Sequence, residues 1–205
     1  MVLYAWVKRF FDVFTALAGI IILLPVFGVI FIAIRLSSKG SVIFRQERAG
    51  KGGKAFVFYK FRTMRSDVDP FGPSPKSGMD DRLTATGRFL REYSLDELPQ
   101  LFNILKGDMS FVGPRPLYVS QVSEWSERQK KRLEVKPGLT GLAQISGRGR
   151  LTREEKLELD VQYVERQGLL FDIKLILYTF GQVFRRKDIY EDKYSKRERT
   201  RGQAD

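Results

Sequence analysis

The most marked feature of the polarity pattern is an uncharged stretch close to the N-terminus. Residues 13–34 form 22 consecutive positions without a formal charge, bounded by Asp12 and Arg35. A helix of about 20 apolar residues is long enough to span the hydrocarbon core of a bilayer. Pro25 lies near the middle, where it removes one backbone hydrogen bond and clashes with the preceding turn. The pattern therefore predicts a membrane segment broken or kinked at Pro25, in preference to a buried core helix.

Basic residues on both sides of this stretch bear on its topology. Lys8 and Arg9 precede it, and four further cations follow it at Arg35, Lys39, Arg45 and Arg48. Short segments rich in Lys and Arg stay on the cytoplasmic side. Each arm of about ten residues reaches only about halfway across the bilayer. We therefore favour a re-entrant helix-break-helix with both ends in the cytoplasm, with a single kinked span as the alternative.

The rest of the chain alternates strands, helices and loops rich in glycine and proline. Residues 41–46 and 54–62 flank a glycine-rich turn and predict a short β-hairpin. Two segments, 65–81 and 135–150, are expected to be loops. Helices are expected at 83–91, from after Ser94 to about 106, and at 120–134, 152–167 and 169–186. The last of these is strongly apolar, which fits either a core helix or a helix lying on a membrane surface.

Charge and composition limit the classes of binding partner and the types of residue that could carry out catalysis. The chain carries 36 Lys and Arg against 24 Asp and Glu, a net charge of +12. A strongly basic protein binds polyanions such as nucleic acid, anionic lipid or phosphorylated substrates. The chain has no cysteine and no histidine. Disulfides, Cys/His zinc sites and histidine-activated nucleophiles are therefore excluded, which leaves catalysis to Asp, Glu, Lys, Tyr, Ser or Thr.

Two adjacent carboxylates, Asp96 and Glu97, lie at a predicted helix start. Ser94 and Glu97 fit a capping box, with Asp96 in the first turn, which is a purely structural explanation. The same position also suits an enzyme, because free N–H groups and the helix dipole stabilise a carboxylate and attract phosphate. An ionised carboxylate can attack phosphorus to form an acyl phosphate. Asp96 is also an oxygen ligand of the kind that Mg²⁺ prefers.

Three basic segments are candidates for phosphate contact. In the segment 107–116, Arg115 lies between two prolines, which restrict its backbone and so lower the entropy lost in holding a phosphate. In the segment 136–149, glycines allow close backbone approach to a ligand, and Arg148 lies between two of them. In the segment 60–64, basic and aromatic residues alternate, which fits nucleic acid, an anionic membrane or a substrate phosphate.

Together these segments resemble the monotopic phosphoglycosyl transferases, also called the bacterial sugar transferase family. The ordered match runs over residues 6–185 and consists of the segments 8–12, 60–64, 94–103, 106–116 and 136–148. The short chain is similar to the minimal members, which lack an extra N-terminal multi-span domain. Two positions depart from the common pattern. Leu24 precedes Pro25 where many members have Ser, and Gly149 follows Arg148 where Asn is common.

The resemblance implies transfer of a sugar-1-phosphate from a UDP-sugar to polyprenyl (undecaprenyl) phosphate. Asp96 would be the nucleophile that forms a covalent phosphosugar intermediate and releases UMP, with Glu97 as its partner carboxylate. Mg²⁺ would bind the diphosphate near Asp96. The implied phosphate-binding residues are Arg91, Arg115 and Arg148, together with Lys60 and Arg62 of the basic segment.

The resemblance also implies an α+β, mainly helical fold with three parts. Residues 1–36 would form the re-entrant membrane hairpin, and 37–186 a cytoplasmic catalytic domain with a short β-hairpin and membrane-surface helices. Residues 187–205 would be a charged tail. The expected place is the bacterial inner membrane, with the catalytic domain facing the cytoplasm. Membrane lipid is an expected partner, nucleic acid is not, and the apolar helix at 169–186 is compatible with a homodimer.

Two other functions fit parts of the sequence. A membrane-anchored nucleic-acid-binding protein would explain the charge and the basic-aromatic segment, although no recognisable nucleic-acid module accompanies them. A non-enzymatic scaffold for polysaccharide assembly would tolerate the loss of Asp96. Hexose-1-phosphate and N-acetylated amino sugars both fit the proposed enzyme.

Overall fold

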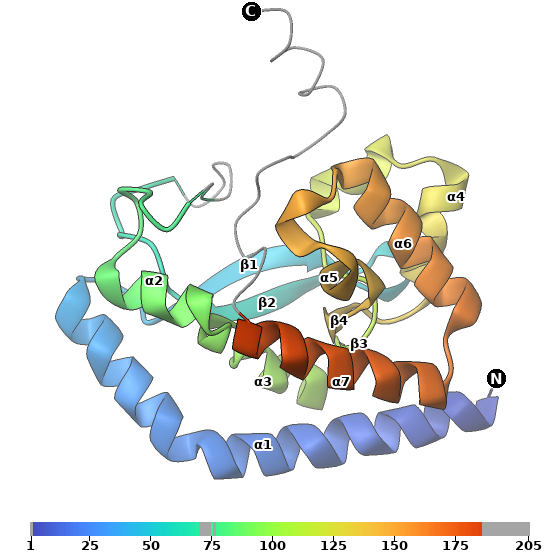
Figure 1. The fold of residues 1–205 in the computed structure, drawn as a ribbon, viewed down its shortest axis with the longest axis horizontal. Helices are drawn as coiled ribbons and strands as arrows, with labels where there is room; N and C mark the ends of the chain where they lie inside the picture. Colours follow the sequence, from blue (N-terminus) through green and yellow to red (C-terminus); the bar gives the residue numbers. More distant parts are fainter. Residues whose placement is uncertain (1, 70–74, 76, 186–205) are drawn as a thin grey trace, which may run out of the picture.

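The computed structural model describes residues 2–69, 75 and 77–185 (Figure 1). The helices are α1 Val2–Ser37, α2 Ala85–Glu92, α3 Gln100–Lys106, α4 Glu127–Lys130, α5 Leu142–Ser146, α6 Arg153–Arg166 and α7 Leu169–Arg185. The strands are β1 Ile43–Ala49, β2 Ala55–Phe61, β3 Ser110–Val112 and β4 Gly138–Thr140. Five 3₁₀ turns complete the set: η1 Lys51–Gly53, η2 Leu95–Glu97, η3 Val119–Glu124, η4 Lys131–Glu134 and η5 Arg148–Arg150. The molecule is mainly helical, as predicted, and it has a second small sheet besides the predicted β-hairpin.

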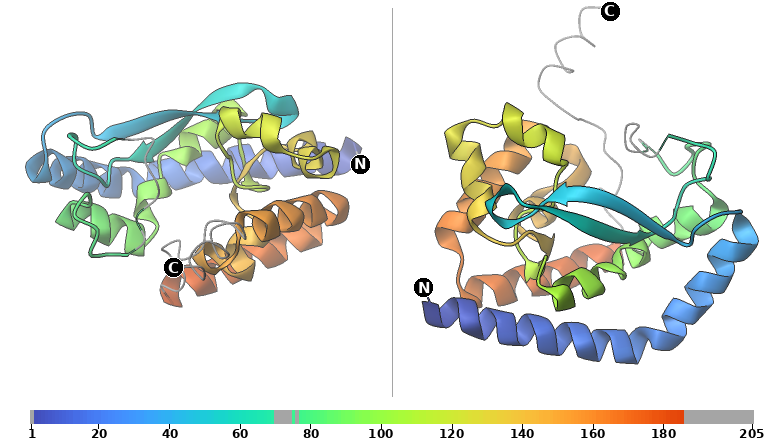
Figure 2. Two further views of the ribbon diagram at one scale, coloured as in Figure 1. Left: turned by 90° about the horizontal axis from the view of Figure 1, so that it is seen from above. Right: turned by 180° about the vertical axis from the view of Figure 1, so that it is seen from behind.

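Helix α1 runs without interruption through Pro25, and it bends so that the other elements lie on its concave side (Figures 1 and 2). The predicted break at Pro25 therefore takes the form of a bend in one helix. A proline inside a helix lacks the N–H of one backbone hydrogen bond and crowds the preceding turn, which is a common cause of helix bending.

The packing of α1 changes at the same proline. The first part of the helix packs into a core with residues of α3 and β2, and Leu23 is the last α1 residue in that core. The second part begins with Val26 and packs into a different core with β2 and α2. The first core consists of Ala16, Phe58, Leu101, Ile104 and Met109, and the second of Ile30, Ile34, Val42, Phe61 and Leu90. The bend lets one helix bury two apolar faces against two parts of the domain.

The outer surface of α1 is strongly apolar. Leu3–Ser37 is the only described segment long and apolar enough to cross a membrane by length and composition. Its exposed side chains include Leu3, Trp6, Phe10, Phe14, Leu17, Ile21, Ile22, Leu24, Val29, Phe31, Ile32 and Leu36. A contiguous apolar surface of this size marks contact with a membrane or a partner. This supports the predicted membrane association.

Strands β1 and β2 form the predicted hairpin, and α3 is fixed to it through Asn103. The pairing is antiparallel and runs from Ile43 opposite Phe61 to Ala49 opposite Ala55. The Asn103 side chain is fully buried; it accepts a hydrogen bond from the Tyr59 N–H (3.0 Å) and donates one to the Val57 carbonyl (2.6 Å). Helix α3 thus lies along β2 in a fixed register.

The second sheet is a parallel pair, β3 and β4, in which glycine permits backbone contact. Ser110 lies opposite Gly138, and Val112 lies opposite Thr140. A Cβ on Gly138 would lie 2.1 Å from the Gly113 nitrogen, and one on Gly113 would lie 2.4 Å from the Lys136 carbonyl oxygen. These glycines therefore allow two segments of the chain to touch each other. Their place in the sequence suggested close approach to a ligand.

Helices α6 and α7 lie on the opposite side of the domain from the β1–β2 ribbon (Figure 2). They pack through a third core of Val112, Tyr163, Val164 and Leu175. The start of α1 is attached to this unit by polar contacts. Lys8 forms an ion pair with Asp172 of α7, and the Tyr163 hydroxyl donates a hydrogen bond to the same carboxylate (2.9 Å). Asp12 accepts a hydrogen bond from the Phe111 N–H (3.0 Å).

Three sequence predictions need correction. The predicted helix from after Ser94 to Lys106 is divided into η2 and α3. Residues 120–134 do not form one helix but three short pieces, η3, α4 and η4, and the predicted loop 135–150 contains β4, α5 and η5. The predicted helices at 83–91, 152–167 and 169–186 are confirmed as α2, α6 and α7. The charged tail at 187–205 lies outside the described residues.

Gly138→Ala tests the backbone contact between β3 and β4. The added Cβ would meet backbone atoms that cannot rotate away, so we expect a loss larger than the roughly 1–3 kcal/mol typical of an overpacked core. Thermal unfolding in detergent measures it. Gly181→Ala is the matched control, because its Cβ would meet nothing within 4 Å and alanine favours a helix. Equal melting temperatures for both variants would contradict the contact.

Candidate active site

The Asp96 carboxylate is buried beside a single lysine. Asp96 lies in η2, between α2 and α3, and only 3% of the residue is exposed. Its Oδ2 lies 2.5 Å from Nζ of Lys60, the penultimate residue of β2. An ionised carboxylate cannot be buried without a compensating charge or hydrogen bonds. Lys60 supplies that charge as the partner of Asp96 in an ion pair.

The turn that aims Asp96 inward has an unusual backbone conformation. Ser94 has a φ of 56°, in the left-handed region, and it is the only described non-glycine residue with positive φ. Its side chain makes no cap hydrogen bond, so the predicted capping box of Ser94 and Glu97 is wrong. A left-handed residue of this type costs on the order of 1 kcal/mol, and such strain occurs often at functional sites. Here it reverses the chain between α2 and η2.

Lys60 interacts electrostatically with three neighbouring charged side chains, Asp96, Arg91 and Glu97, and the four are called the Lys60 cluster. Burial lowers the pKa of Lys60, and the nearby Arg91 guanidinium lowers it further, while Asp96 and Glu97 act in the opposite direction. The interactions that stabilise its charge therefore come from the two adjacent carboxylates of η2. The four side chains form one coupled group, as the sequence motifs suggested.

Arg91 is placed by a close contact between α2 and the segment that follows β2. A Cβ on Gly87 would lie only 1.9 Å from the Thr63 carbonyl oxygen, so α2 rests directly on the backbone there. Arg91, in the last turn of α2, donates from Nε to the buried Thr63 hydroxyl (3.0 Å). The contact orients the guanidinium toward the Lys60 side of the cluster.

Arg115 forms the outer edge of the site. Its Nη2 donates to Glu97 Oε1 at 2.8 Å; the arginine side chain is 44% exposed and the glutamate side chain 14%. Pro114 and Pro116 on either side are buried. The backbone is thus anchored in the domain while the guanidinium reaches solvent next to Glu97. An arginine fork in this position can bind a phosphate bidentately.

Arg62, another predicted phosphate ligand, contacts the residue that follows α1. Its Nη2 donates to the Ser38 carbonyl (2.8 Å) and the Ser38 hydroxyl (2.9 Å). Arg148 begins η5, and its side chain lies outside the described part of the structure. Asp108 follows the far end of α3 and accepts a weak hydrogen bond from Asn103 (3.3 Å).

The carboxylates suit a metal ion that is held mainly by its substrate. Within the described residues, no three His, Cys, Asp or Glu side chains are grouped closely enough to hold a metal ion. Asp96 and Glu97 are adjacent, and each is already paired with a cation. Mg²⁺ is typically bound by one or two carboxylates plus substrate phosphates. The donor set therefore fits Mg²⁺ that arrives with a diphosphate.

Sequence reasoning missed the supports of the site. Thr63 lies inside the basic-aromatic segment 60–64, but nothing in its neighbours shows that it receives Arg91. Arg132 and Asp160 form a buried ion pair whose arginine also contacts the Arg115 carbonyl (2.5 Å). Both belong to stretches rich in charge, where a buried residue gives no distinct signal.

The chain is similar to a family of known proteins over most of its length. A family model described as "Bacterial sugar transferase" matches residues 3–186. An "Uncharacterized sugar transferase EpsL" of Bacillus subtilis (strain 168) is 43% identical, over 97% of this chain and 97% of that protein. A "UDP-glucose:undecaprenyl-phosphate glucose-1-phosphate transferase" of Escherichia coli (strain K12) is 41% identical over 89% of this chain.

The relatives differ in length. This chain spans only 41% of the Escherichia coli protein. A protein with the same name from Caulobacter vibrioides is 38% identical over 89% of this chain, which covers 72% of that relative. The family model, over residues 3–186, covers every element described above apart from the first residue of α1.

Proposed function

The chain belongs to the bacterial sugar transferase family, and on that premise we propose that it transfers a sugar-1-phosphate from a UDP-sugar to undecaprenyl phosphate. The products are polyprenyl-diphospho-sugar and UMP. This is the first membrane step in assembling a bacterial surface glycan. Relatives named as glucose-1-phosphate transferases support the donor and acceptor classes.

The observation that carries this proposal is the buried Asp96–Lys60 pair beside Glu97 and Arg115. A carboxylate held as an anion, with arginines beside it, suits attack on a phosphorus atom. It suits neither nucleic-acid recognition nor a scaffold, because neither needs a buried charge at a strained turn.

In the first step, an Asp96 carboxylate oxygen attacks the β-phosphorus of the UDP-sugar. A bond forms between that oxygen and phosphorus, and the bond from phosphorus to the bridging oxygen breaks. UMP leaves with the bridging oxygen and its electron pair. The phosphosugar stays on Asp96 as an acyl phosphate. Lys60 remains beside the oxygen whose negative charge is lost.

In the second step, a phosphate oxygen of undecaprenyl phosphate attacks the same phosphorus. The bond to Asp96 breaks, and the carboxylate regains its electron pair beside Lys60. A phosphate monoester is largely ionised near neutral pH, since its second pKa is roughly 6. The acceptor therefore needs no strong base, and we assign Glu97 to orienting Arg115.

The cations take distinct roles in this scheme. Arg115 binds the diphosphate from the solvent side, and Arg91 adds positive charge from α2. Arg148 stays a predicted phosphate ligand that rests on the family resemblance, and Arg62 stays one that rests on the basic-aromatic segment 60–64. Asp96 and the substrate's own phosphates would hold Mg²⁺, which would supply positive charge to neutralise the diphosphate.

We also propose that α1 enters the membrane and returns to the cytoplasmic face. The bend in α1, the apolar outer surface and the cations at both ends support this topology. Helix α7 adds exposed apolar side chains on one face, Leu170, Ile173, Leu177 and Phe180, which suits a helix on the membrane surface. The site then lies near the acceptor's phosphate. A homodimer stays a prediction.

Asp96→Asn should abolish transfer. With undecaprenyl phosphate, Mg²⁺ and a panel of UDP-sugars, we expect UMP release to fall at least about a thousandfold, because the amide cannot replace the nucleophile. Asp108→Asn is the matched control and should keep its rate, since Asp108 lies at the far end of α3. Full turnover by a folded Asp96→Asn protein would refute the nucleophile.

Lys60→Met should lower the rate of UMP release. Removing one partner of a buried ion pair leaves the other charge uncompensated, so Asp96 should no longer be held in its place beside β2. We expect kcat/KM to fall at least about tenfold. Lys130→Met, which removes only an exposed cation, should leave kcat/KM unchanged. An unchanged kcat/KM in Lys60→Met would count against the pairing.

Single cysteines can test the topology of α1, because the chain has none of its own. Cysteines at Val2 and at Lys39 should both react with an impermeant thiol reagent in inside-out vesicles. Neither should react in right-side-out vesicles, since both ends then lie on the cytoplasmic side. Labelling of the two positions from opposite sides would establish a single span.

A further inference from the structure

Behind Arg115 lies a buried ion pair that joins two distant parts of the chain. Arg132 of η4 and Asp160 of α6 are 3% and 2% exposed. Arg132 donates to Asp160 Oδ2 from Nε (3.1 Å) and from Nη2 (2.8 Å). The Trp125 ring covers the guanidinium, with its centroid 4.7 Å from Cζ.

The same arginine holds the main chain of Arg115. Arg132 Nη2 donates to the Arg115 carbonyl oxygen at 2.5 Å. Burial raises the pKa of Asp160, whereas the charges of Arg132 and Arg115 and the Arg115 main chain lower it. Arg115 is thus gripped through its backbone while its guanidinium extends to Glu97.

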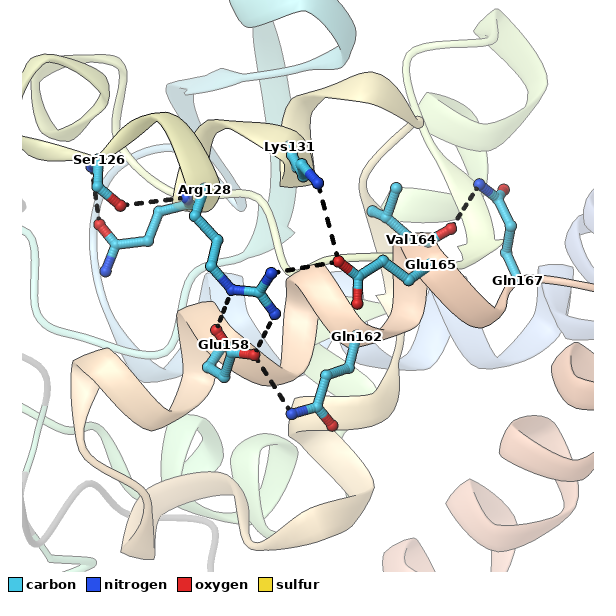
Figure 3. Close-up of polar contacts among 9 residues, drawn as sticks. Ser126, Arg128, Lys131, Glu158, Gln162, Val164, Glu165 and Gln167 are labelled. Carbon is cyan, nitrogen blue, oxygen red and sulfur yellow. Dashed lines mark hydrogen bonds and ion pairs between the residues drawn. The ribbon is translucent and has the colours of Figure 1, made fainter.

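Stability alone is a poor explanation for this pair. Burying two charges costs several kcal/mol per ion, and well-packed apolar residues of similar size are often equally stable. Helix α4, which directly precedes η4, is already joined to α6 at the surface, where Arg128 pairs with Glu158 (2.7 Å) and Glu165 (3.3 Å) of α6 (Figure 3). The exposed pair could hold α4 against α6 without the cost of burial. An apolar pair, however, could not donate a hydrogen bond to the Arg115 carbonyl.

We propose that Arg132 and Asp160 are positioning residues that fix Arg115 for phosphate binding. Asp160 orients the Arg132 guanidinium, Arg132 fixes the Arg115 carbonyl, and the rigid backbone between Pro114 and Pro116 then aims the Arg115 side chain. This inference rests on the proposed function, because it assigns the pair to the diphosphate subsite. Neither residue would touch the substrate.

A double-mutant cycle separates positioning from folding. The test variant is Arg132→Met with Asp160→Asn, which removes both charges and so leaves no unpaired buried ion. Arg132→Lys is a milder variant, because one ammonium group cannot make the same two-sided contact. Arg128→Met is the matched control at the exposed pair. Each is made in the full chain, with and without Arg115→Met.

The kinetic readout is UMP release from UDP-glucose with undecaprenyl phosphate, well below the melting temperature of every variant. We expect the test variant to lower kcat/KM about tenfold to a hundredfold, as misplacement of a binding group does. In the Arg115→Met background it should change kcat/KM less than twofold, because nothing is left to position. Equal losses in both backgrounds, or no loss in either, would overturn the proposal.

A second readout needs no substrate. Hydrogen exchange at the Arg115 and Leu117 amides should speed up in the test variant and not in Arg128→Met, since Arg132 donates to the Arg115 carbonyl and Arg128 pairs with α6 instead. Unchanged exchange would overturn positioning even if activity fell. The exchange result and the activity can fail separately. If exchange is faster in the test variant than in the unaltered protein, but the unaltered protein releases no UMP from any UDP-sugar in the panel, the proposed function fails while the positioning of Arg115 stands.

Discussion

Burial of the Asp96 carboxylate is the constraint around which the domain is arranged. A buried anion needs a compensating charge or hydrogen bonds, and Lys60 at the end of β2 provides a cation at 2.5 Å. The chain must therefore bring a strand end and the α2–α3 turn together. Gly87 lets α2 rest on the backbone after β2, and the left-handed Ser94 turns the chain inward. The strained Ser94 and the tight contact at Gly87 both serve to bring Asp96 next to Lys60.

The membrane helix and the site are coupled through shared cores. Phe58 and Phe61 of β2 each belong to a core that includes a different part of α1, and Lys60 lies between them. The bend at Pro25 therefore places the outer surface of α1 and the Asp96 pair in a fixed relation. If that surface lies in lipid, the site lies close to the plane where a lipid-linked phosphate would be. The packing of α1 against β2 would then set the position of the active site relative to the membrane.

Local patterns predicted the elements and the chemical residues, but not the contacts between distant segments. The charge-free stretch around Pro25 and the alternating strands carry their own periodicity, so they were foreseen. The pairing of Asp96 with Lys60 needs the tertiary fold, although both residues were named from motifs. The buried Arg132–Asp160 pair was missed because both residues lie in charged stretches typical of solvated helices. The local sequence fits a capping box of Ser94 and Glu97, but the turn that places Asp96 inward requires a left-handed Ser94, which makes no cap hydrogen bond.

The central claim is that Asp96 carries the phosphosugar, and trapping that intermediate tests it most directly. The protein would be incubated with Mg²⁺ and UDP-glucose, or another productive UDP-sugar, in the absence of undecaprenyl phosphate. Intact-protein mass spectrometry would follow, with peptide mapping. The account predicts one phosphosugar adduct on the peptide that contains Asp96, lost when undecaprenyl phosphate is added. UMP formation that requires both substrates together, with no adduct under any condition, would mean direct transfer and would contradict it.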